Sequence, residues 1–379
     1  MQNNNIPKIR FNGFTAPWEQ RKLANVVDSV DTGKSKFDKE GSSGEYPILG
    51  STSVIGYDEE YDYEGDFILT ARVGANAGSL YRHAGKVKIS DNTVFIQASQ
   101  NIEFLYQLLI QFDIKKLSFG TGQPLVKASE LKSLELMMPT DMKEQMQIGA
   151  YFSELDNLIA LHQRKYDKLT NVKKSMLEKL FPKNGASVPK IRFKGFSDAW
   201  EQRKVGEVGS VSMCRRIFKE QTSESGDIPF YKIGTFGGQA DAYISSELFA
   251  EYRSKYPYPK EGDILISASG SIGRTVEFTG KNEYFQDSNI VWLSHDDRLN
   301  NTFLKCFYSV VKWAGIEGST IKRLYNDNIL NTVISMPSVA EQKRIGTFFK
   351  ELDNLITLHQ CKLEKLKHIK QACLEQMFL

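Results

Sequence analysis

The chain has 379 residues, but it contains little cysteine and no long apolar stretch. The four cysteines stand far apart, at Cys214, Cys306, Cys361 and Cys373, without a C-x-x-C pair or a histidine cluster beside them. This distribution argues against a disulfide framework or a zinc site, and it favours a reducing cytoplasm. No apolar run reaches the roughly 18 residues that a membrane helix needs. The residues before Pro7 lack the basic and apolar regions of a secretory signal.

An excess of charge of one sign is also missing. The sequence has 49 Lys and Arg residues against 46 Asp and Glu residues, which gives a net charge of +3 at pH 7. Such a small excess produces no strong positive field over the whole molecule. If the partner is a polyanion such as nucleic acid, local basic patches must therefore attract it.

Catalytic motifs are absent as well. Residues 32–35 carry the G-K-S end of a phosphate-binding loop, but Asp28 stands where that motif requires its first glycine. Residues 74–78 and 270–273 are glycine-rich without a clear helix after them, and neither H-E-x-x-H nor G-x-S-x-G occurs. The five histidines are scattered. We therefore predict that the chain is not an enzyme and that it holds no metal ion or cofactor of its own.

The strongest pattern in the sequence is an internal repeat. Ile6–Phe14 returns as Val188–Phe196 with an offset of 182, whereas Glu154–Ile159 returns as Glu351–Ile356 with an offset of 197. The second half therefore carries about fifteen extra residues, which we place around residues 246–260. Each half is predicted to contain a short leader, a mixed segment of strands and short helices, and one long helix.

The repeat divides the chain into matching parts. The two mixed segments, which we call module 1 and module 2, share a skeleton of predicted strands and differ in their loops. Short helices are expected at Phe104–Phe112 in module 1 and at Phe303–Trp313 in module 2. The predicted boundaries are 1–23 for the first leader, 24–139 for module 1, 140–187 for the first long helix and linker, 188–205 for the second leader, 206–337 for module 2 and 338–379 for the C-terminal long helix.

Both long helices carry the periodicity of a coiled coil. Each begins with a capping-box pattern, Asp141 with Glu144 in the first helix and Ser338 with Glu341 in the second. Apolar residues then recur at spacings of four and three over four to five heptads, which is typical of a coiled-coil seam. The seam positions are Ile148, Phe152, Leu155, Ile159, His162, Tyr166 and Leu169 in the first helix and Ile345, Phe349, Leu352, Ile356, His359, Leu363 and Leu366 in the second.

The most direct interpretation is that the two helices pair with each other and dock partners. At roughly 1.5 Å per residue, a helix of about 40 residues is near 60 Å long, which exceeds the core of a small module. A less favoured alternative buries each helix in a separate core. The seam residues His162 and His359 could form a metal pair or a pH switch, but we favour a hydrogen-bonded interior pair that helps to fix the register.

The repeat also predicts how the halves are arranged. If a pseudo-two-fold axis relates them, the helices are antiparallel, and the end of the second helix near Phe378 lies beside the first leader near Pro7. The predicted fold class is α+β, with two mixed α/β modules in pseudo-two-fold symmetry. Two long antiparallel helices that form a coiled coil separate the modules.

The loops that differ between the modules are rich in basic and small polar residues. A basic polar loop is usually only a solvated surface, but these loops recur at matching places in both modules. Lys and Arg neutralise phosphates, and Arg, Asn, Gln, Ser and Thr can read base edges. The predicted DNA-binding residues are Lys34, Lys36, Ser51, Thr52, Arg72, Asn76, Arg82 and Gln123 in module 1 and Lys232, Thr235, Ser269, Arg274, Thr320, Lys322 and Arg323 in module 2.

Together, the repeated motifs resemble those of specificity (S) subunits of type I restriction-modification systems, over nearly the whole chain. The resemblance rests on the leader P-K-I-R-F-x-G-F…W-E-Q-R-K, a G-D strand, an M-P…E-Q helix start and the helix F-x-E-L-D-N-L-I, all present twice. No single one of these motifs is specific, but the doubled set is.

That resemblance implies a function and partners. In such subunits each module is a target-recognition domain that reads one half of a bipartite double-stranded DNA site. The paired helices set the gap between the halves and dock two modification subunits, which carry adenine-methyltransferase chemistry and S-adenosylmethionine. A separate motor-nuclease restriction subunit uses ATP and Mg²⁺. Two alternatives remain from the residues alone: a tandem coiled-coil scaffold that binds protein partners without DNA, and a self-sufficient nuclease or methyltransferase.

Overall fold

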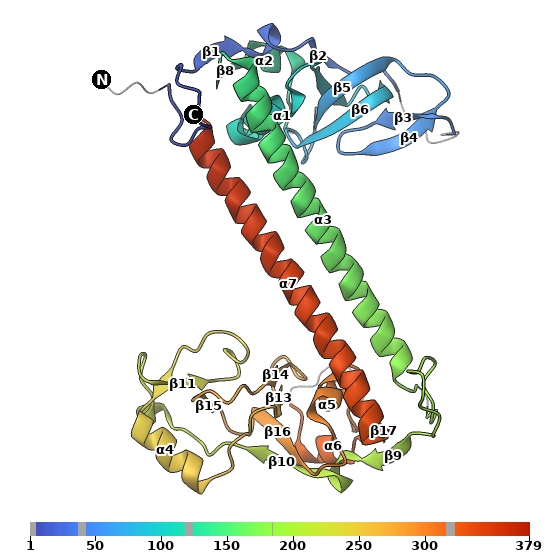
Figure 1. Cartoon of the computed structure of the whole chain (residues 1–379), viewed down its shortest axis with the longest axis vertical. Helices are drawn as coiled ribbons and strands as arrows, with labels where there is room; N and C mark the ends of the chain where they lie inside the picture. The colour runs from blue at the N-terminus through green and yellow to red at the C-terminus, as the bar shows by residue number, and fades with distance from the viewer. Residues whose placement is uncertain (1–4, 37–42, 118–123, 184, 316–322) are drawn as a thin grey trace. The chain divides into compact units, whose positions relative to one another are not determined.

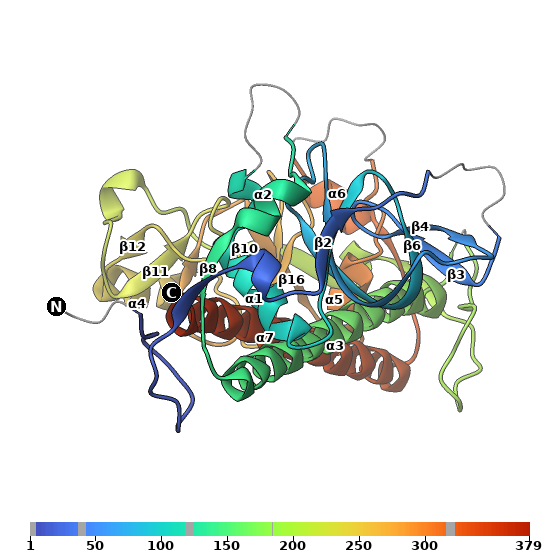
Figure 2. The ribbon, with the colours of Figure 1, turned by 90° about the horizontal axis from the view of Figure 1, so that it is seen from above.

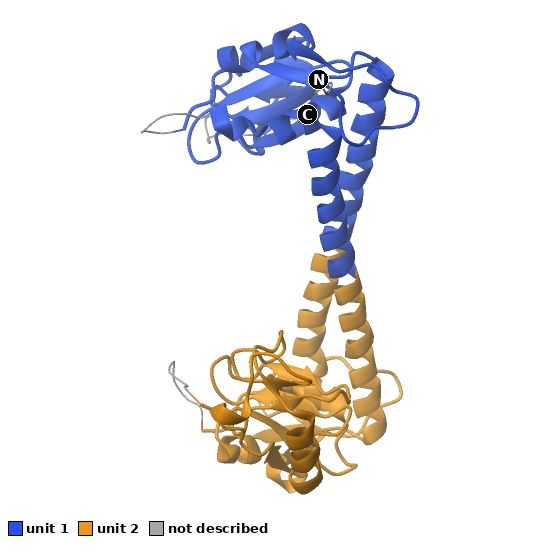
Figure 3. Cartoon of the chain, turned by 90° about the vertical axis from the view of Figure 1, so that its left-hand side faces the viewer, with its two compact units in different colours: residues 1–164, 359–379 blue, residues 165–358 orange. Residues whose placement is uncertain are grey.

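The structure, a computed structural model, describes residues 5–36, 43–117, 124–183, 185–315 and 323–379. The chain divides into two compact units (Figure 3). Unit 1 contains residues 1–164 and 359–379, and unit 2 contains residues 165–358. Each unit thus combines one module with a segment of each long helix.

The two long helices begin where the capping patterns predicted. Helix α3 spans Met142–Leu180 and helix α7 spans Val339–Met377, each with 39 residues, and both start in one unit and end in the other. The side chain of Asp141 accepts a hydrogen bond from the amide of Lys143 (2.8 Å), and the hydroxyl of Ser338 also accepts an amide hydrogen bond in the first turn of α7.

The second half of each predicted capping box was wrong, because the glutamate binds an arginine of the leader instead. Arg10 donates two hydrogen bonds to Glu144, the longer of 2.6 Å, and Arg192 donates two of 2.7 Å to Glu341. Both glutamates are at most 1% exposed. Each leader is therefore fastened to the start of the long helix that follows its module.

The long helices pack against each other in an antiparallel direction within each unit. In unit 1, Asp156 in the first half of α3 forms an ion pair of 2.6 Å with Lys370 in the second half of α7. In unit 2, Lys173 near the end of α3 pairs at 2.5 Å with Asp353 near the start of α7. Later residues of one helix meet earlier residues of the other, which confirms the predicted direction inside both units.

The predicted seam faces inward on both helices. The Nδ1 atoms of His162 and His359 lie 2.9 Å apart, so the predicted hydrogen-bonded pair is present. Where each helix meets its module, the seam joins the core of that module, so the alternative of separate cores is partly right for the helix ends. The buried seam residues are Ile148, Phe152, Leu155, Ile345, Phe349, Leu352 and Leu363, and the half-buried ones are Ile159, His162, Tyr166, Leu169, Ile356, His359 and Leu366.

The first leader and the C-terminal helix end meet in unit 1, as the repeat predicts. The amide of Ile9 donates to the carbonyl of Gln376 (3.0 Å), and Trp18 packs edge-on against Phe378 with ring centroids 6.0 Å apart. Figures 1 and 2 both show the leader, drawn in dark blue, beside the end of α7. The second leader makes the equivalent hydrogen bond and aromatic contact with the end of α3 in unit 2.

Module 1 is built on a six-stranded sheet with a core on each face. Along the central strand, Ile68 faces the core that contains helix α1 (Ile102–Phe112), whereas Phe67 and Leu69 face the opposite core. Strands β3 and β6 pair in parallel, and the other neighbours pair antiparallel. The strand order is β2 (Ser29–Thr32), β7 (Thr93–Gln97), β5 (Tyr63–Ala71), β6 (Leu80–Ile89), β3 (Tyr46–Leu49) and β4 (Val54–Asp58).

Module 2 keeps the centre of this sheet and adds a second, smaller sheet. Ile264 and Ile266 face the core beside the long helices, and Leu265 faces a core under helix α4 (Ser246–Lys255), which lies where we placed the extra residues. The first sheet contains β10 (Gly209–Met213), β16 (Ile290–His295), β13 (Ile264–Ser267) and β14 (Thr275–Glu277), and the second contains β12 (Tyr243–Ile244), β11 (Ile228–Tyr231) and β15 (Tyr284–Phe285).

Short elements connect each module to its leader and helix. The predicted helix at 303–313 is α5 (Asn301–Tyr308), which ends earlier than expected, just before the β-branched pair Val310 and Val311. Strands β1 (Glu19–Lys22) and β8 (Glu135–Met138) form one two-stranded ladder, and β9 (Glu201–Lys204) and β17 (Val333–Met336) form the other. The described residues also form the short helices α2 (Ala128–Ser133) and α6 (Asn326–Asn331). Turns of 3₁₀ helix lie at Leu23–Asn25, Ile114–Leu117, Val205–Glu207 and Lys219–Gln221.

Two glycines let the short helices approach the long ones closely. A Cβ atom on Gly149 of α3 would lie 2.7 Å from the amide nitrogen of Phe104 in α1. A Cβ atom on Gly346 of α7 would overlap with the side chain of Thr302 in α5. The glycines inside the two coiled-coil patterns are therefore packing requirements.

We expect a circular permutant opened at Asn184, with Leu379 joined to Gln2 by a short flexible linker, to fold. The first leader already contacts the end of α7, so the new connection spans a short distance. The melting temperature measured by circular dichroism should stay within a few degrees of the parent value. A permutant opened at Lys165 inside α3 is the control, and equal loss of structure in both permutants would contradict the prediction.

We expect Gly346→Ala to lower the free energy of unfolding by about 1–3 kcal/mol, because the added methyl group overpacks the contact with α5. Urea denaturation of the full chain measures this change. Gly234→Ala is the matched control, since no atom lies within 4 Å of the Cβ position there. Equal stability of the two variants would show that α5 can move away from α7 at no cost.

Candidate nucleic-acid interface

In module 1 the predicted DNA-binding loops gather around the turn before strand β7, residues 90–92, which we call turn 1. The carbonyl of Asn92 accepts hydrogen bonds from the amide of Arg72 (2.9 Å) and the hydroxyl of Ser51 (3.2 Å). The amide of Asp91, the central residue of the turn, donates a hydrogen bond to the carbonyl of Ser35 (3.1 Å). Turn 1 thereby fixes three loops that lie far apart in the sequence.

The loops around turn 1 present polar side chains to solvent. Gly74 adopts a φ of +89°, which favours glycine, and no atom lies within 4 Å of the position of a Cβ there. The backbone after Arg72 is therefore open to close approach by a ligand. The exposed predicted residues of these loops are Lys34, Lys36, Thr52, Arg72 and Asn76, and Ser51 is half-buried.

Tyr81 anchors the loop that carries Ser51 and Thr52. Its hydroxyl donates a hydrogen bond of 2.5 Å to the carbonyl of Gly50. Burial raises the pKa of Tyr81 well above its ordinary value, so the hydroxyl keeps its proton and remains a donor at any physiological pH. The amide of Gly50 in turn donates to the carbonyl of Ser53 (2.9 Å), which closes the loop.

Module 2 uses an equivalent turn before strand β16, residues 287–289, which we call turn 2. The backbone carbonyl of Asn289 accepts a hydrogen bond from the amide of Ala268 (2.7 Å). The side-chain oxygen of Asn289 accepts a hydrogen bond from the hydroxyl of Ser269 (2.8 Å). The carbonyl of Ser288 accepts from the guanidinium of Arg323 (3.2 Å). Turn 2 therefore brings together two predicted DNA-binding residues that are 54 positions apart.

The other described residues predicted for module 2 lie beside turn 2. The hydroxyl of Thr235 accepts a hydrogen bond from the amide of Lys232 (3.1 Å). The next amide, that of Ile233, donates to the side-chain oxygen of Gln286 (2.8 Å), the residue directly before turn 2. The guanidinium of Arg274 donates to the carbonyl of Phe236 (2.7 Å) and so also supports this loop. Five predicted residues of module 2 thus share one surface region.

Arg82 lies apart from this arrangement. Its guanidinium forms an ion pair with Glu103 and sits over the ring of Tyr106, 4.5 Å from the centroid, both on helix α1. It therefore attaches β6 to α1 and does not join the loops around turn 1. Gln123, Thr320 and Lys322 lie outside the described residues.

The sequence interpretation missed the two turns as organising elements. Asn92 and Asn289 occupy the same position of the repeat, but the sequence predicts each only as the start of a strand. A polar residue repeated in front of two β-branched or aromatic runs was the available signal. Its meaning depends on backbone hydrogen bonds to distant loops, which the sequence does not display.

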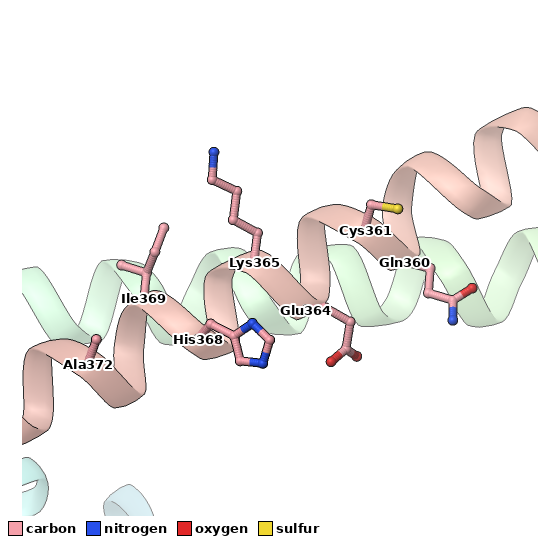
Figure 4. Close-up of a pocket in the computed structure, with 7 residues that line it drawn as sticks. All are labelled: Gln360, Cys361, Glu364, Lys365, His368, Ile369 and Ala372. Atoms are coloured by element: carbon pink, nitrogen blue, oxygen red, sulfur yellow. The ribbon is translucent and has the colours of Figure 1, made fainter. Parts of the chain in front are cut away.

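The described residues contain no candidate metal centre. None of them forms a group of three or more His, Cys, Asp and Glu side chains that could hold a metal ion, and no described helix is long and apolar enough to cross a membrane. A shallow groove on α7 is lined by that helix alone, and Figure 4 shows Lys365 pointing to one side and Glu364 and His368 to the other. The groove residues are Gln360, Cys361, Glu364, Lys365, His368, Ile369 and Ala372.

Comparisons with known proteins identify the family. A model of the type I restriction modification DNA specificity domain matches residues 16–171 and 197–368. A putative type I restriction enzyme specificity subunit of Haemophilus influenzae is 41% identical over 370 residues, which cover 94% of each chain. A type I restriction enzyme specificity subunit of Methanocaldococcus jannaschii is 25% identical over 401 residues, which cover 96% of this chain and 89% of the relative. The chain therefore belongs to the specificity subunits of type I restriction-modification systems.

A solved structure shares the fold. The crystal structure of a type I restriction-modification S subunit from M. genitalium aligns over 99% of both chains with a TM-score of 0.71 and 16% sequence identity. The predicted family and the predicted class, mixed α/β modules joined by long helices, are confirmed.

We expect Tyr81→Phe to loosen the loop at residues 50–53 without unfolding module 1. Loss of the hydrogen bond to Gly50 should cost about 1 kcal/mol, which corresponds to roughly five-fold faster amide exchange in this loop. Hydrogen–deuterium exchange of the full chain measures the change. Tyr57→Phe is the control because Tyr57 is 48% exposed. Unchanged exchange in Tyr81→Phe would show that the loop is held by its own backbone.

Proposed function

We propose that the chain is the non-catalytic subunit that gives a type I restriction-modification enzyme its DNA sequence specificity. Each module reads one half of a bipartite, asymmetric double-stranded DNA site. The observation that carries this proposal is that both modules hold exposed polar side chains around the same turn, with different residues in each. One frame with two different sets of side chains suits two different half-sites.

The clearest difference is at the residue that directly follows the central strand of each module. This residue is Arg72 after Ala71 in module 1 and Ala268 after Ser267 in module 2, and the amide of each donates to the carbonyl of the turn asparagine. Arginine can bind guanine with two hydrogen bonds in the major groove, whereas the buried Ala268 offers no hydrogen-bonding side chain at this point. We therefore infer that this position contributes to the distinction between the half-sites.

Basic residues near the turns supply contacts to phosphates. Lysine and arginine contacts of this kind position a protein on the duplex without reading its sequence. The proposed contacts of the first half-site are Lys34, Lys36, Ser51, Thr52, Arg72, Asn76 and Gln123, and those of the second are Lys232, Thr235, Ser269, Arg274, Thr320, Lys322 and Arg323. Arg82 is not included, because α1 occupies its guanidinium.

We infer that outward-facing leucines of the long helices dock the partner subunits, since the seam residues are used between the helices. Leu158 and Leu161 in unit 1 are 36% and 38% exposed, and their repeat equivalents Leu355 and Leu358 in unit 2 are both 46% exposed. Exposed leucines at equivalent places on two helices offer the same surface twice. Two copies of one partner, the modification subunit, fit this duplication.

The catalytic chemistry is proposed to belong entirely to the partners. The modification subunits would bring adenine methyltransferase activity and S-adenosylmethionine, and motor-nuclease restriction subunits would join through the complex with ATP and Mg²⁺. The chain itself would supply the address, the distance between the half-sites and the docking surfaces. A coiled-coil scaffold without DNA is the less favoured function, and retention on duplex DNA that weakens linearly with the logarithm of salt concentration distinguishes the two.

We expect Arg72→Ala to weaken recognition of the first half-site only. Loss of a bidentate base contact costs about 1–3 kcal/mol, or roughly 5- to 150-fold in affinity. The assay is binding by the complex with its modification subunits to duplexes that carry substitutions in either half-site. Arg21→Ala is the matched control, since Arg21 is exposed on β1 and pairs only locally with Glu19. Relaxed discrimination at both halves would contradict modular reading.

We expect Leu158→Glu combined with Leu161→Glu to remove one of the two modification subunits. The buried glutamates would have no partner in the docked state, so that interface should be lost while the equivalent one in unit 2 remains. Native mass spectrometry should show one partner per chain. Met146→Glu, which changes another exposed apolar residue of α3, is the control. Two bound partners in the double variant would place the docking surface elsewhere.

A further inference from the structure

After strand β10 of module 2, the chain runs along a groove. None of the DNA contacts proposed above lines this groove. The groove has a volume of about 480 Å³. Its floor contains Cys214, which is 2% exposed and whose pKa burial raises to about 12, so the floor is uncharged. Its rim carries Arg215, Arg216, Phe218, Tyr256, Pro257 and Asp287.

The rim combines cationic and aromatic side chains that face solvent. Phe218 is 52% exposed and Tyr256 is 37% exposed, so both rings are accessible to a ligand beside the two arginines. The guanidinium of Arg215 lies 5.2 Å from the ring centroid of Tyr256, and the side chain of Arg216 is 60% exposed. Two arginines face one carboxylate, so the rim has a net positive charge.

The added helix of module 2 builds one wall of this groove. Tyr256 and Pro257 directly follow α4. Helix α4 is fixed by Phe249, which is buried in the second core, and by the edge-on contact of Tyr252 with Tyr284 at 6.2 Å. The wall is therefore held by packing, and the described part of module 1 has no counterpart of α4.

The groove is continuous with the proposed DNA-reading surface. Arg216 donates a hydrogen bond of 2.8 Å to Asp287, the first residue of turn 2. The pairing registers of the two modules also match here: Thr32 faces Val94 in module 1, and Met213 faces Val291 in module 2. Arg215 therefore occupies the position that Lys34 occupies in module 1, and a cation stands at this place in both modules.

We propose that this groove binds the sugar-phosphate backbone of the duplex that flanks the half-site read by module 2, which rests on the proposed function. Arg215 and Arg216 each neutralise a phosphate, and Phe218 and Tyr256 pack against the deoxyribose rings of the same backbone. The contact carries no sequence information. Module 2 thus anchors the complex through an additional, salt-sensitive contact that strengthens binding to every sequence.

The test uses the complex with its modification subunits and compares Arg215→Gln combined with Arg216→Gln against the parent chain. Loss of two phosphate contacts should reduce the slope of log K against log salt by nearly 2 and weaken binding at about 0.1 M salt by tens of fold. Discrimination between matched and mismatched half-sites should stay the same. Lys260→Gln combined with Lys281→Gln is the matched control, because it removes two exposed charges of the same module outside the groove.

Two further measurements define the site. A duplex that ends at the half-site of module 2 should bind the parent and the Arg215→Gln, Arg216→Gln variant equally, whereas removal of the opposite flank should preserve their difference. Phe218→Ala should weaken binding several-fold with an unchanged salt slope, because it removes contacts without charge.

The outcomes separate this inference from the function on which it rests. An unchanged salt slope in the double arginine variant, with normal sequence-specific binding by the parent, would overturn the groove and leave the function intact. Loss of a modification subunit from the variant would assign the groove to a protein contact and would also overturn the inference. A parent complex that shows no salt-dependent, sequence-specific DNA binding would overturn the function itself.

Discussion

Each half of this protein depends on an arginine of the leader that binds a buried glutamate at the start of a long helix. Glu144 and Glu341 are almost fully buried, so their charges must be compensated inside the protein. Arg10 and Arg192 supply the charge in a paired geometry, which is the strongest form of such a contact. Removal of one partner from a buried ion pair typically costs about 3–5 kcal/mol. This contact fastens each leader, which also carries a ladder strand and a buried tryptophan, to the long helix that follows its module.

The frame so formed tolerates change in the loops because backbone atoms hold them. In both modules the carbonyl of an asparagine before the last central strand, Asn92 or Asn289, accepts the amide at the end of the neighbouring strand. Main-chain hydrogen bonds do not depend on side-chain identity, so the residues at the surface can differ while the frame persists. Arg72 and Ala268 illustrate this freedom, since their amides stand at the same point of the frame and their side chains differ.

The sequence predicted the features that rest on periodicity and repetition. The long helices, their inward seam, their direction and the place of the extra residues near 246 all followed from the spacing of apolar residues and from the two offsets. The capping boxes were predicted wrongly because the competing partner of Glu144 is 134 residues away. The contact of Arg82 was not predicted for a related reason: its partner, Glu103, belongs to a helix that meets the sheet only in the folded protein. The turns stayed hidden because backbone contacts between distant loops leave no pattern in the residues.

The closing of unit 1 by both ends of the chain has a consequence for how the protein is made. Leu374, Met377 and Phe378 belong to the same buried cluster as Trp18 and Phe104. On the ribosome, module 1 emerges early, yet its interior remains open until the final turns of α7 have left the exit tunnel. Unit 2 is one continuous piece, residues 165–358, and can complete its own interior sooner. The half that is translated first is therefore the half that is sealed last.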